Sequence, residues 1–436
     1  MNSLIKFLLQ LIFICLLSMA VQASDKQDPL GLILSWQQDP TTTMTIDWHT
    51  LANEANAEVF YKKANSESEV WTQAKGDVSN FPYSERKINR VELTGLESDT
   101  LYEFRLAGFA RVRSFRTMPT STVERAITFA IGGDVRGNVL KMNKVNRQAS
   151  HFNPDFVIWG GDMSYGNSDP ALVNRLYEMF DSVMHTLISS DGRTLPVIVA
   201  IGNHEVKGGY LYNNDHDLRK KLPLYQQNDA SRAQIAPYFY DLHAFPGQPG
   251  YGALDFGDYL SLIILDTDHS NPVAGKQTSW LEQALKERAK MVNIMPIYHV
   301  GAFPAVRDPE ADTPVNIRKH WLPLFEKAGV KVAFENHDHV YKRTFAIKNG
   351  QKSDHGIVYF GDGAWGTDPR EIGRSHKSHA WYLERVAAQR HVIIATLKGR
   401  GQHFLVINED GKIIDEYPTT SQLDNVHSNL ATPWLE

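Results

Sequence analysis

The sequence predicts a two-domain protein in which a small all-β sandwich precedes a larger α/β domain. The chain has 436 residues, more than one simple core usually accommodates. Short segments of alternating polar and apolar residues fill its first quarter, whereas apolar runs alternate with helical patterns in the remainder. A polar, proline-containing segment at 117–122 separates these regions, as is typical of domain boundaries.

The first region has the period of two that β-strands impose on their side chains. Residues 44–48 and 102–106 alternate between apolar and polar side chains, which predicts strands with one buried face. Leu96 and Tyr102 precede a late strand in the manner of the tyrosine corner found in immunoglobulin-type and fibronectin-type sandwiches. We therefore expect residues 24–119 to form a sandwich of this kind.

Apolar runs after residue 126 predict buried strands joined by helices, in an α/β domain that extends to residue 418. The expected strands are 127–131, 156–159, 197–201, 259–265, 294–297 and 331–334. Apolar residues with helical spacing predict helices over 172–187 and 317–328, the second ending at Gly329. Residues 280–285 are predicted to form a helix core, and the aromatic cluster 238–240 a packed strand.

The N-terminal segment indicates export. Lys6 precedes an apolar run from Phe7 to Val21, and Ala23 provides a small residue for cleavage, so residues 1–23 are predicted to be a signal peptide. A retained N-terminal anchor is the alternative. Cleavage removes Cys15, the single cysteine, and leaves a mature chain without disulfides. We expect a secreted or periplasmic protein with no membrane span after processing.

Charge argues against a nucleic-acid partner. The formal net charge is −5, whereas proteins that bind nucleic acids through the phosphate backbone present basic faces. The short basic run at 219–221 is interpreted as a solvated helix face. Residues 419–436 are expected to form a tail beyond the second domain.

Five predicted strands lead into side chains that can bind metal ions. These blocks are Gly133-Asp134, Gly161-Asp162-Met163-Ser164-Tyr165, Gly202-Asn203-His204-Glu205, Tyr298-His299 and Asn336-His337-Asp338-His339. Each block alone is weak, because a Gly-Asp pair is usually a turn and most histidines at strand ends bind nothing. Ligands of α/β domains gather at the carboxyl ends of strands, however, and turns have no need of histidine or tyrosine there. Together the five blocks predict a metal site.

The same blocks resemble those of the calcineurin-like metallophosphoesterases. Tyr165, three residues after Asp162, resembles the purple acid phosphatase branch of that superfamily. The segment 34–48 resembles the fibronectin type III-like N-terminal domain of this branch, and 361–366 resembles its glycine-rich block. The resemblance implies an α/β/β/α catalytic domain and an exported phosphomonoesterase that acts on a small-molecule phosphate ester.

The resemblance also implies two metal ions that share Asp162 as a bridging ligand. Asp134, Tyr165 and His339 would complete one site, and Asn203, His299 and His337 the other. Because a coordinated tyrosinate needs a strong Lewis acid, the first site is expected to hold iron(III). Imidazole and amide ligands in the second site suit zinc, iron(II) or manganese(II). A metal-activated hydroxide would attack phosphorus, and His204 would stabilise the transition state or protonate the leaving oxygen.

Three positions depart from the pattern of the branch. Arg136 follows Asp134, and two interpretations stay open for it: a phosphate clamp or a surface ion pair. Asn336 replaces a glycine, which we expect to alter only the turn because asparagine tolerates a left-handed backbone. Arg307 lies downstream of His299, where plant-type members carry histidines that protonate the leaving group, so acid assistance there is in doubt. The next histidine, His320, is interpreted as structural.

Two other functions compete with a phosphomonoesterase. A phosphodiesterase would use the same centre, and a cell-surface binding module could retain the fold without catalysis. A hydrolase that has lost its activity in evolution normally lacks some ligand residues. Here every ligand position carries a residue that can bind metal, which favours an enzyme. No Gly-x-Ser-x-Gly sequence occurs, which argues against a serine hydrolase. The natural substrate, the pH optimum, the second metal and the oligomeric state stay open.

Overall fold

The computed structural model describes residues 26–66, 70–209, 228–361, 363–372 and 380–418. The predicted signal peptide, the basic run at 219–221 and the expected C-terminal tail lie outside these ranges. Among the helices so described, none is long and apolar enough to cross a membrane.

Two four-stranded antiparallel sheets form the N-terminal sandwich. In sheet order, the first contains β1 (Leu32–Ser35), β2 (Met44–Leu51), β6 (Arg86–Leu93) and β5 (Asp77–Asn80). The second contains β4 (Thr72–Lys75), β3 (Glu58–Lys63), β7 (Leu101–Leu106) and β8 (Arg113–Arg116), and a short 3₁₀ helix, η1 (Ala52–Glu54), follows β2. The hydroxyl of Tyr102 accepts a hydrogen bond from the Glu97 amide over 2.9 Å, as a tyrosine corner requires. The predicted all-β sandwich is confirmed.

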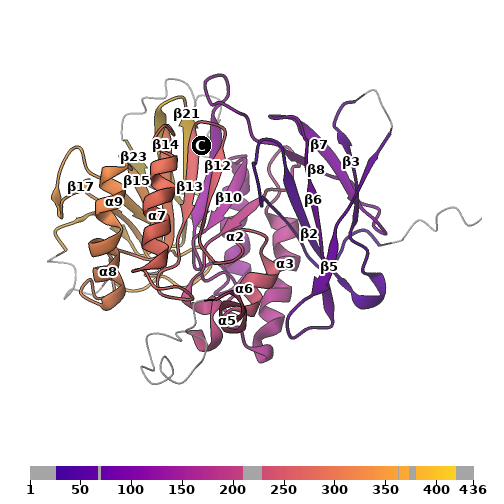
Figure 1. Ribbon diagram of the computed structural model, residues 1–436, viewed down its shortest axis with the longest axis horizontal. Coiled ribbons are helices and arrows are strands. Elements are labelled where there is room, and N and C mark those ends of the chain that lie inside the picture. Colours follow the sequence, from indigo (N-terminus) through magenta and orange to yellow (C-terminus); the bar gives the residue numbers. More distant parts are fainter. Residues whose placement is uncertain (1–25, 67–69, 210–227, 362, 373–379, 419–436) are drawn as a thin grey trace, which may run out of the picture.

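Strand β2 is buried on both faces, contrary to the half-buried strand that its alternation predicts. Ile46 and Trp48 face the sandwich core, and the opposite face packs on the second domain. There the His49 ring meets Phe180 of α3 (Val173–Thr186) edge-on, with centroids 4.6 Å apart. Period-two patterning reports side-chain polarity, and in this strand the polar face is covered by another domain. Figure 1 shows α3 beside the indigo sandwich.

Two larger sheets build the second domain. The six-stranded sheet runs β11 (Val197–Val199), β10 (Phe156–Trp159), β9 (Ile127–Gly132), β21 (His391–Lys398), β22 (Gly401–Asn408) and β23 (Ile413–Tyr417). The seven-stranded sheet runs β12 (Gly252–Phe256), β13 (Leu260–Ile264), β14 (Asn293–Val300), β15 (Val332–Asn336), β19 (Val358–Gly361), β16 (Tyr341–Thr344) and β20 (Leu383–Ala387). A separate two-stranded hairpin consists of β17 (Ile347–Lys348) and β18 (Gln351–Lys352), and a bridge joins Ile347 to Ile357, just before β19. Within each sheet the strands that lead to the predicted ligands are parallel.

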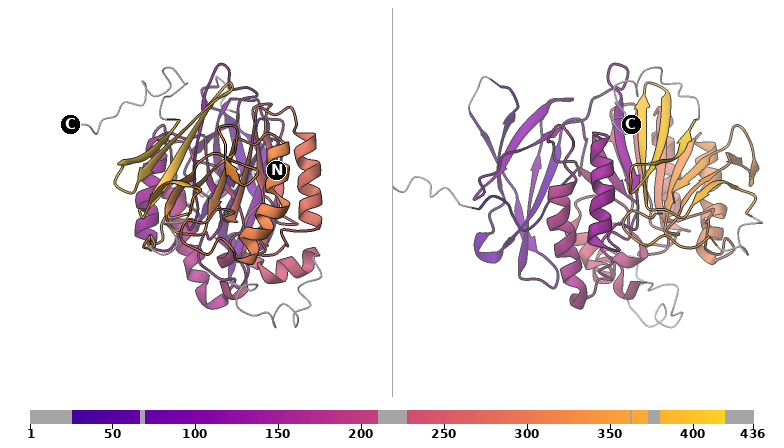
Figure 2. Two further views of the ribbon diagram at one scale, coloured as in Figure 1. Left: turned by 90° about the vertical axis from the view of Figure 1, so that its left-hand side faces the viewer. Right: turned by 180° about the vertical axis from the view of Figure 1, so that it is seen from behind.

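The two sheets pack face to face and helices cover their outer sides (Figure 2). Phe129 of β9 and Phe334 of β15 belong to the apolar core between the sheets. Helices α2 (Val139–His151), α3, α5 (Asp229–Ile235) and α6 (Pro237–Leu242) line the first sheet, and α7 (Lys276–Glu287), α8 (Asp312–His320) and α9 (Leu322–Lys327) line the second. Three short 3₁₀ helices, η2 (Pro170–Leu172), η3 (Asn203–Glu205) and η4 (Lys207–Gly209), lie in the loops. The α/β/β/α architecture is confirmed.

Two local predictions were wrong. The aromatic cluster 238–240 lies in helix α6, because Pro237 occupies the first helical turn and presets the backbone for a helix. The helix expected over 317–328 is two helices that meet at Trp321. Pro323 explains the break, because proline has no amide hydrogen and its ring displaces the preceding turn. The second helix ends before Gly329, whose φ is +73°, as predicted.

Candidate metal centre

The carboxyl ends of parallel strands bring all seven predicted ligands to one edge of the domain. Asp134 follows β9, Asp162 and Tyr165 follow β10, Asn203 begins η3 beyond β11, and His337 and His339 follow β15. His299 is the exception, because it lies within β14 and not beyond its end. The register between β14 and β15 shifts between Ile297 and Val300, so the strand is irregular where it carries this histidine.

Five of these residues adopt a left-handed backbone, which side chains other than glycine rarely do. Their φ angles are 55° at Asp134, 54° at Asp162, 57° at Tyr165, 85° at His337 and 57° at His339. Each such residue costs about 1–3 kcal/mol and persists only where its surroundings impose it. Strain of this kind concentrates at functional sites, and here it falls on the predicted ligands.

Asp134, Tyr165 and His339 form one cluster of donor atoms. The Tyr165 hydroxyl donates to Asp134 Oδ1 over 2.8 Å and lies 3.2 Å from His339 Nε2. His339 Nε2 lies 2.8 Å from the same carboxylate oxygen. Burial, followed by the charge of Asp134, raises the pKa of the Tyr165 phenol well above its usual value. The Tyr165 phenol therefore keeps its proton unless a bound cation replaces that proton.

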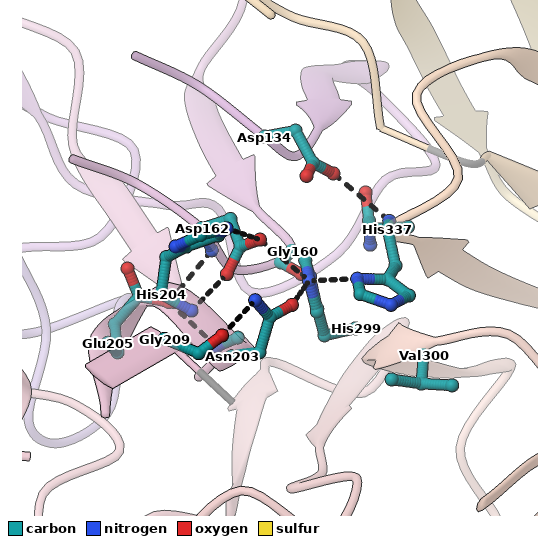
Figure 3. A network of polar contacts seen from close by, with 12 residues as sticks. Asp134, Gly160, Asp162, Asn203, His204, Glu205, Gly209, His299, Val300 and His337 are labelled. Carbon is teal, nitrogen blue, oxygen red and sulfur yellow. Dashed lines mark hydrogen bonds and ion pairs between the residues drawn. The ribbon is translucent and has the colours of Figure 1, made fainter. Parts of the chain in front are cut away.

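A second cluster is centred on the imidazole of His299 (Figure 3). Its Nδ1 lies 2.8 Å from the Gly160 carbonyl oxygen, which can only accept, so Nδ1 carries the hydrogen. In the neutral ring Nε2 is then an acceptor. It faces Asp162 Oδ2 at 3.2 Å, Asn203 Oδ1 at 3.2 Å and His337 Nδ1 at 3.0 Å. The Asn203 amide nitrogen donates to the Gly209 carbonyl over 3.0 Å, which fixes its oxygen toward the cluster.

The oxygens of Asp162 and Asn203 and the nitrogens of His299 and His337 converge in a way that fits a cation. Ligand atoms of Asp162, His299 and His337 all lie within 4.8 Å of one another, and all three residues are buried. The hydrogen bond from His299 to a backbone carbonyl is the usual support of a metal-binding imidazole. Where no metal is bound, a proton can fill this role: burial lowers the pKa of His299, but Asp162 outweighs it and raises the pKa to about 9. The donor set fits a metal ion.

Asp162 contacts the second cluster directly and acts on the first through its charge. Its Oδ2 faces His299, whereas Oδ1 accepts the backbone N–H of His204 over 2.7 Å. Burial raises the pKa of this carboxyl, but the neighbouring His299 and His204 outweigh burial and lower it well below its usual value. Its charge also raises the pKa of Tyr165 in the other cluster. The ionised carboxylate therefore acts on both clusters.

Glu205 was missed as a functional residue by the sequence analysis, where it appeared only as the end of a block. Its carboxylate accepts the backbone N–H groups of Gly202 at 2.7 Å, Asp162 at 2.8 Å and Met163 at 2.8 Å. Burial and the nearby Asp162 raise its pKa to about 8. Glu205 thus fixes the backbone that carries Asp162 and ties it to the loop of Asn203. No sequence signal marked this role, because the carboxylate binds amides that only the fold brings together.

The glycine-rich block packs directly on Asp134. Gly363 has a φ of +45°, and a Cβ atom there would lie 2.0 Å from Asp134 Oδ2. The amide of Gly366 donates to the Asp134 carbonyl over 3.1 Å, and that of Trp365 to the Gly133 carbonyl over 3.1 Å. The block therefore needs glycine so that its backbone can hold the first ligand. Asp362 lies outside the described residues.

The His204 side chain lies beside Tyr165 and Asp162. Its ring lies 4.2 Å from the Tyr165 ring, its Nδ1 is 2.6 Å from Asn167 Oδ1, and its Nε2 is 3.9 Å from Asp162 Oδ2. Its side chain is 21% exposed, so substrate can reach it. Burial lowers its pKa. The contact with Asn167 orients the imidazole, which can then exchange hydrogen bonds with a bound substrate.

The structure favours one of the two interpretations of Arg136 and differs from the turn expected at Asn336. Arg136 forms an ion pair with Glu178 of α3, which agrees with the surface ion pair among its two interpretations. Asn336 does not adopt a left-handed backbone but ends strand β15. Its side-chain amide donates to the Tyr298 carbonyl over 3.1 Å. Its side chain fills the space that Gly133 and Gly160 leave open. Asn336 therefore packs against the site rather than shaping a turn.

Comparison with known families agrees with this geometry. Residues 127–349, just over half of the chain, match the calcineurin-like phosphoesterase family. The chain belongs to this family. Residues 29–117 match the purple acid phosphatase N-terminal domain, so each of the two domains matches a family model.

The chain is also similar to proteins that are named acid phosphatases and to a solved structure of one of them. Purple acid phosphatase 18 of Arabidopsis thaliana is 23% identical over 80% of this chain and 74% of its own length. Acid phosphatase type 7 of Mus musculus is 26% identical over 93% of this chain and 95% of its own length. The purple acid phosphatase PPD1 from yellow lupin seeds superposes with a TM-score of 0.69 at 15% identity, covering 88% of this chain and 73% of that one. At that identity the superposition shows the fold alone.

Proposed function

We propose that this protein is an exported, metal-dependent phosphomonoesterase with a dinuclear centre. The observation that carries the proposal is the convergence of buried acceptors on His299 Nε2, next to a second cluster with a carboxylate, a phenol and an imidazole. Membership of the phosphoesterase family supports hydrolysis of a phosphate ester. Export rests on the predicted signal peptide, and the substrate is expected to be a small phosphate ester.

The ligand division follows the two clusters. Asp162 is proposed to bridge the metals, with Asp134, Tyr165 and His339 holding iron(III). Asn203, His299 and His337 are proposed to hold zinc, iron(II) or manganese(II), because imidazole and amide donors suit these ions. The high pKa of the Tyr165 phenol requires a strongly acidic ion for tyrosinate formation, which supports iron(III) in the first site.

Metal ions bound here would supply Lewis acidity and a hydroxide at neutral pH. The residues of the chain perform the remaining tasks. Asp162 is proposed to set the separation of the two sites. Glu205 holds its backbone N–H, and the His204 amide holds its carboxylate. His204, when it is protonated at Nε2, is proposed to donate a hydrogen bond to the phosphoryl group as negative charge develops on it. Arg136 is paired with Glu178, and we do not assign it a catalytic role.

One assay distinguishes the proposed activity from its alternatives. Purified protein of known metal content is given a nitrophenyl phosphate monoester and the corresponding diester across a range of pH. Faster hydrolysis of the monoester supports the proposal, and faster hydrolysis of the diester identifies a phosphodiesterase. A protein with two metals per chain that hydrolyses neither supports a binding module.

A further inference from the structure

A strained turn, residues 166–169, holds His204 in place. The Asp169 amide closes the turn by donating to the Gly166 carbonyl over 2.9 Å. The two central residues have positive φ angles, 52° at Asn167 and 46° at the next residue, which side chains other than glycine rarely adopt. Asn167 contacts His204 twice: its amide donates to the His204 carbonyl over 3.0 Å, and its Oδ1 lies 2.6 Å from His204 Nδ1. The orientation of this imidazole therefore depends on the shape of the turn.

Tyr238 supports this turn from helix α6. Its hydroxyl donates to the Asp169 carbonyl over 3.1 Å. Its ring lies near Gly166, at the opposite end of the turn, where a Cβ atom would be 3.6 Å from Tyr238 Cδ2. Tyr238 is only 4% exposed, so solvent does not compete for this contact. Both ends of the turn are therefore in contact with one buried tyrosine.

The ring of Tyr238 also contacts the N-terminal sandwich. The connection between β5 and β6 places the rings of Phe81 and Tyr83 edge-on to it, with centroids 6.3 and 5.7 Å away. Edge-on pairs of aromatic rings attract each other beyond the burial of their surface. A chain of contacts thus leads from the sandwich through Tyr238 and the turn to His204.

We propose that Tyr238 is a positioning residue through which the N-terminal sandwich keeps His204 oriented for phosphoryl transfer. The inference rests on the proposed phosphomonoesterase function, in which His204 donates a hydrogen bond to the phosphoryl group. Tyr238 contributes no group to the reaction and acts on the turn alone. Two adjacent residues with positive φ persist only where their surroundings impose that backbone. Without the support of Tyr238 the turn relaxes, and Asn167 no longer holds the His204 imidazole in one orientation.

The test removes the Tyr238 hydroxyl and measures kcat and KM for nitrophenyl phosphate. We expect Tyr238→Phe to lose about tenfold in kcat, less than the roughly 100-fold that a misplacement of about 1 Å can cost. KM should stay close to the wild-type value, because the His204 hydrogen bond is made as charge develops in the transition state. In a His204→Ala background the same change should cost nothing further, because no imidazole remains to be positioned.

Tyr83→Asn tests the contribution of the sandwich. Tyr83 is 46% exposed and has a φ of 57°, a backbone that asparagine tolerates, so the change is compatible with folding. It removes one of the two rings that pack on Tyr238 from the sandwich. We expect a smaller loss of kcat than in Tyr238→Phe, and this loss should also disappear in the His204→Ala background. Wild-type kcat in Tyr83→Asn would remove the sandwich from the proposal.

Tyr240→Phe is the matched control. Tyr240 lies on the same helix, and its hydroxyl also donates to a backbone carbonyl, that of Pro249, over 3.1 Å. Pro249 lies outside the turn, so this variant should keep wild-type kcat, and elemental analysis checks that every variant keeps wild-type metal content.

Four results overturn the inference. They are wild-type kcat in Tyr238→Phe, an equal loss in Tyr240→Phe, a loss in Tyr238→Phe that comes with lower metal content, and a loss that persists in the His204→Ala background. Absence of monoester hydrolysis in the wild type instead refutes the proposed function, and with it the role of His204 on which the inference rests.

Discussion

The backbone N–H of Asp162 donates to Glu205 Oε2 over 2.8 Å. Through this bond a buried carboxylate holds the residue proposed to bridge two metals, and the same oxygen accepts the Gly202 amide. The strained, left-handed Asp162 is thus supported by a residue that is itself buried.

Glu205→Ala is expected to weaken both metal sites. The change leaves the amides of Gly202, Asp162 and Met163 buried without acceptors, and each unsatisfied group costs about 1–3 kcal/mol. Metal titration and urea unfolding should show loss of affinity and of unfolding free energy together. A variant with wild-type metal content and stability would contradict the supporting role of Glu205.

Gly363→Ala is expected to disrupt the first site selectively. Its Cβ would lie 2.0 Å from Asp134 Oδ2, so the carboxylate must move. Gly350→Ala is the control, because Gly350 has a comparable positive φ of +68° and nothing within 4 Å of the added atom. Elemental analysis should find iron loss in the first variant and normal content in the second. Equal metal content in both would contradict the assigned packing role.

Tyr165→Phe tests the proposed identity of the first metal. A tyrosinate bound to iron(III) absorbs visible light, so the wild-type protein is expected to be coloured and the variant to lose this band. Because the variant also loses one of the proposed ligands, it should retain less iron. An iron-loaded wild type without a visible band, or a variant with an unchanged spectrum, would contradict iron(III)–tyrosinate coordination.

Acid destabilisation is expected at the contact between the two domains. Burial and then Arg86 lower the pKa of His49 to about 3, and burial and then Arg90 lower that of His243 to about 3. The unfolded chain, with histidine pKa values of about 6.5, binds protons first, so stability is full above that pH and falls as the pH drops toward 3. Over that range each histidine lowers the free energy of unfolding by about 1.4 kcal/mol per pH unit.

The variant His49→Phe separates this effect from other acid effects. It replaces an imidazole that packs edge-on against Phe81 and Phe180 with a ring that cannot titrate. Urea unfolding between pH 7 and pH 4.5 should show a smaller loss of stability in the variant. The difference should correspond to one proton fewer bound on unfolding. An identical pH dependence in both proteins would show that His49 does not contribute.

The fold was largely predictable, and the residues predicted as ligands do lie close together, whereas the contacts that support them could not be predicted. Apolar runs with their terminal Asp, Asn and His residues identify the strands because burial and strand ends are local features of the sequence. The acceptor role of Glu205, the contact of Gly363 with Asp134 and the pairing of Arg136 with Glu178 depend on residues far apart in the chain. Pro323 marks the break between α8 and α9, but the single helix over 317–328 was predicted from apolar periodicity alone.

The shared carboxylate is tested most directly by counting metals in the wild type and in Asp162→Asn. We expect about two metal ions per wild-type chain, because two clusters of ligands adjoin Asp162. In the variant both sites should lose affinity together and phosphomonoesterase activity should disappear. One metal per wild-type chain, or an Asp162→Asn variant that retains two metals and full activity, would contradict the dinuclear centre.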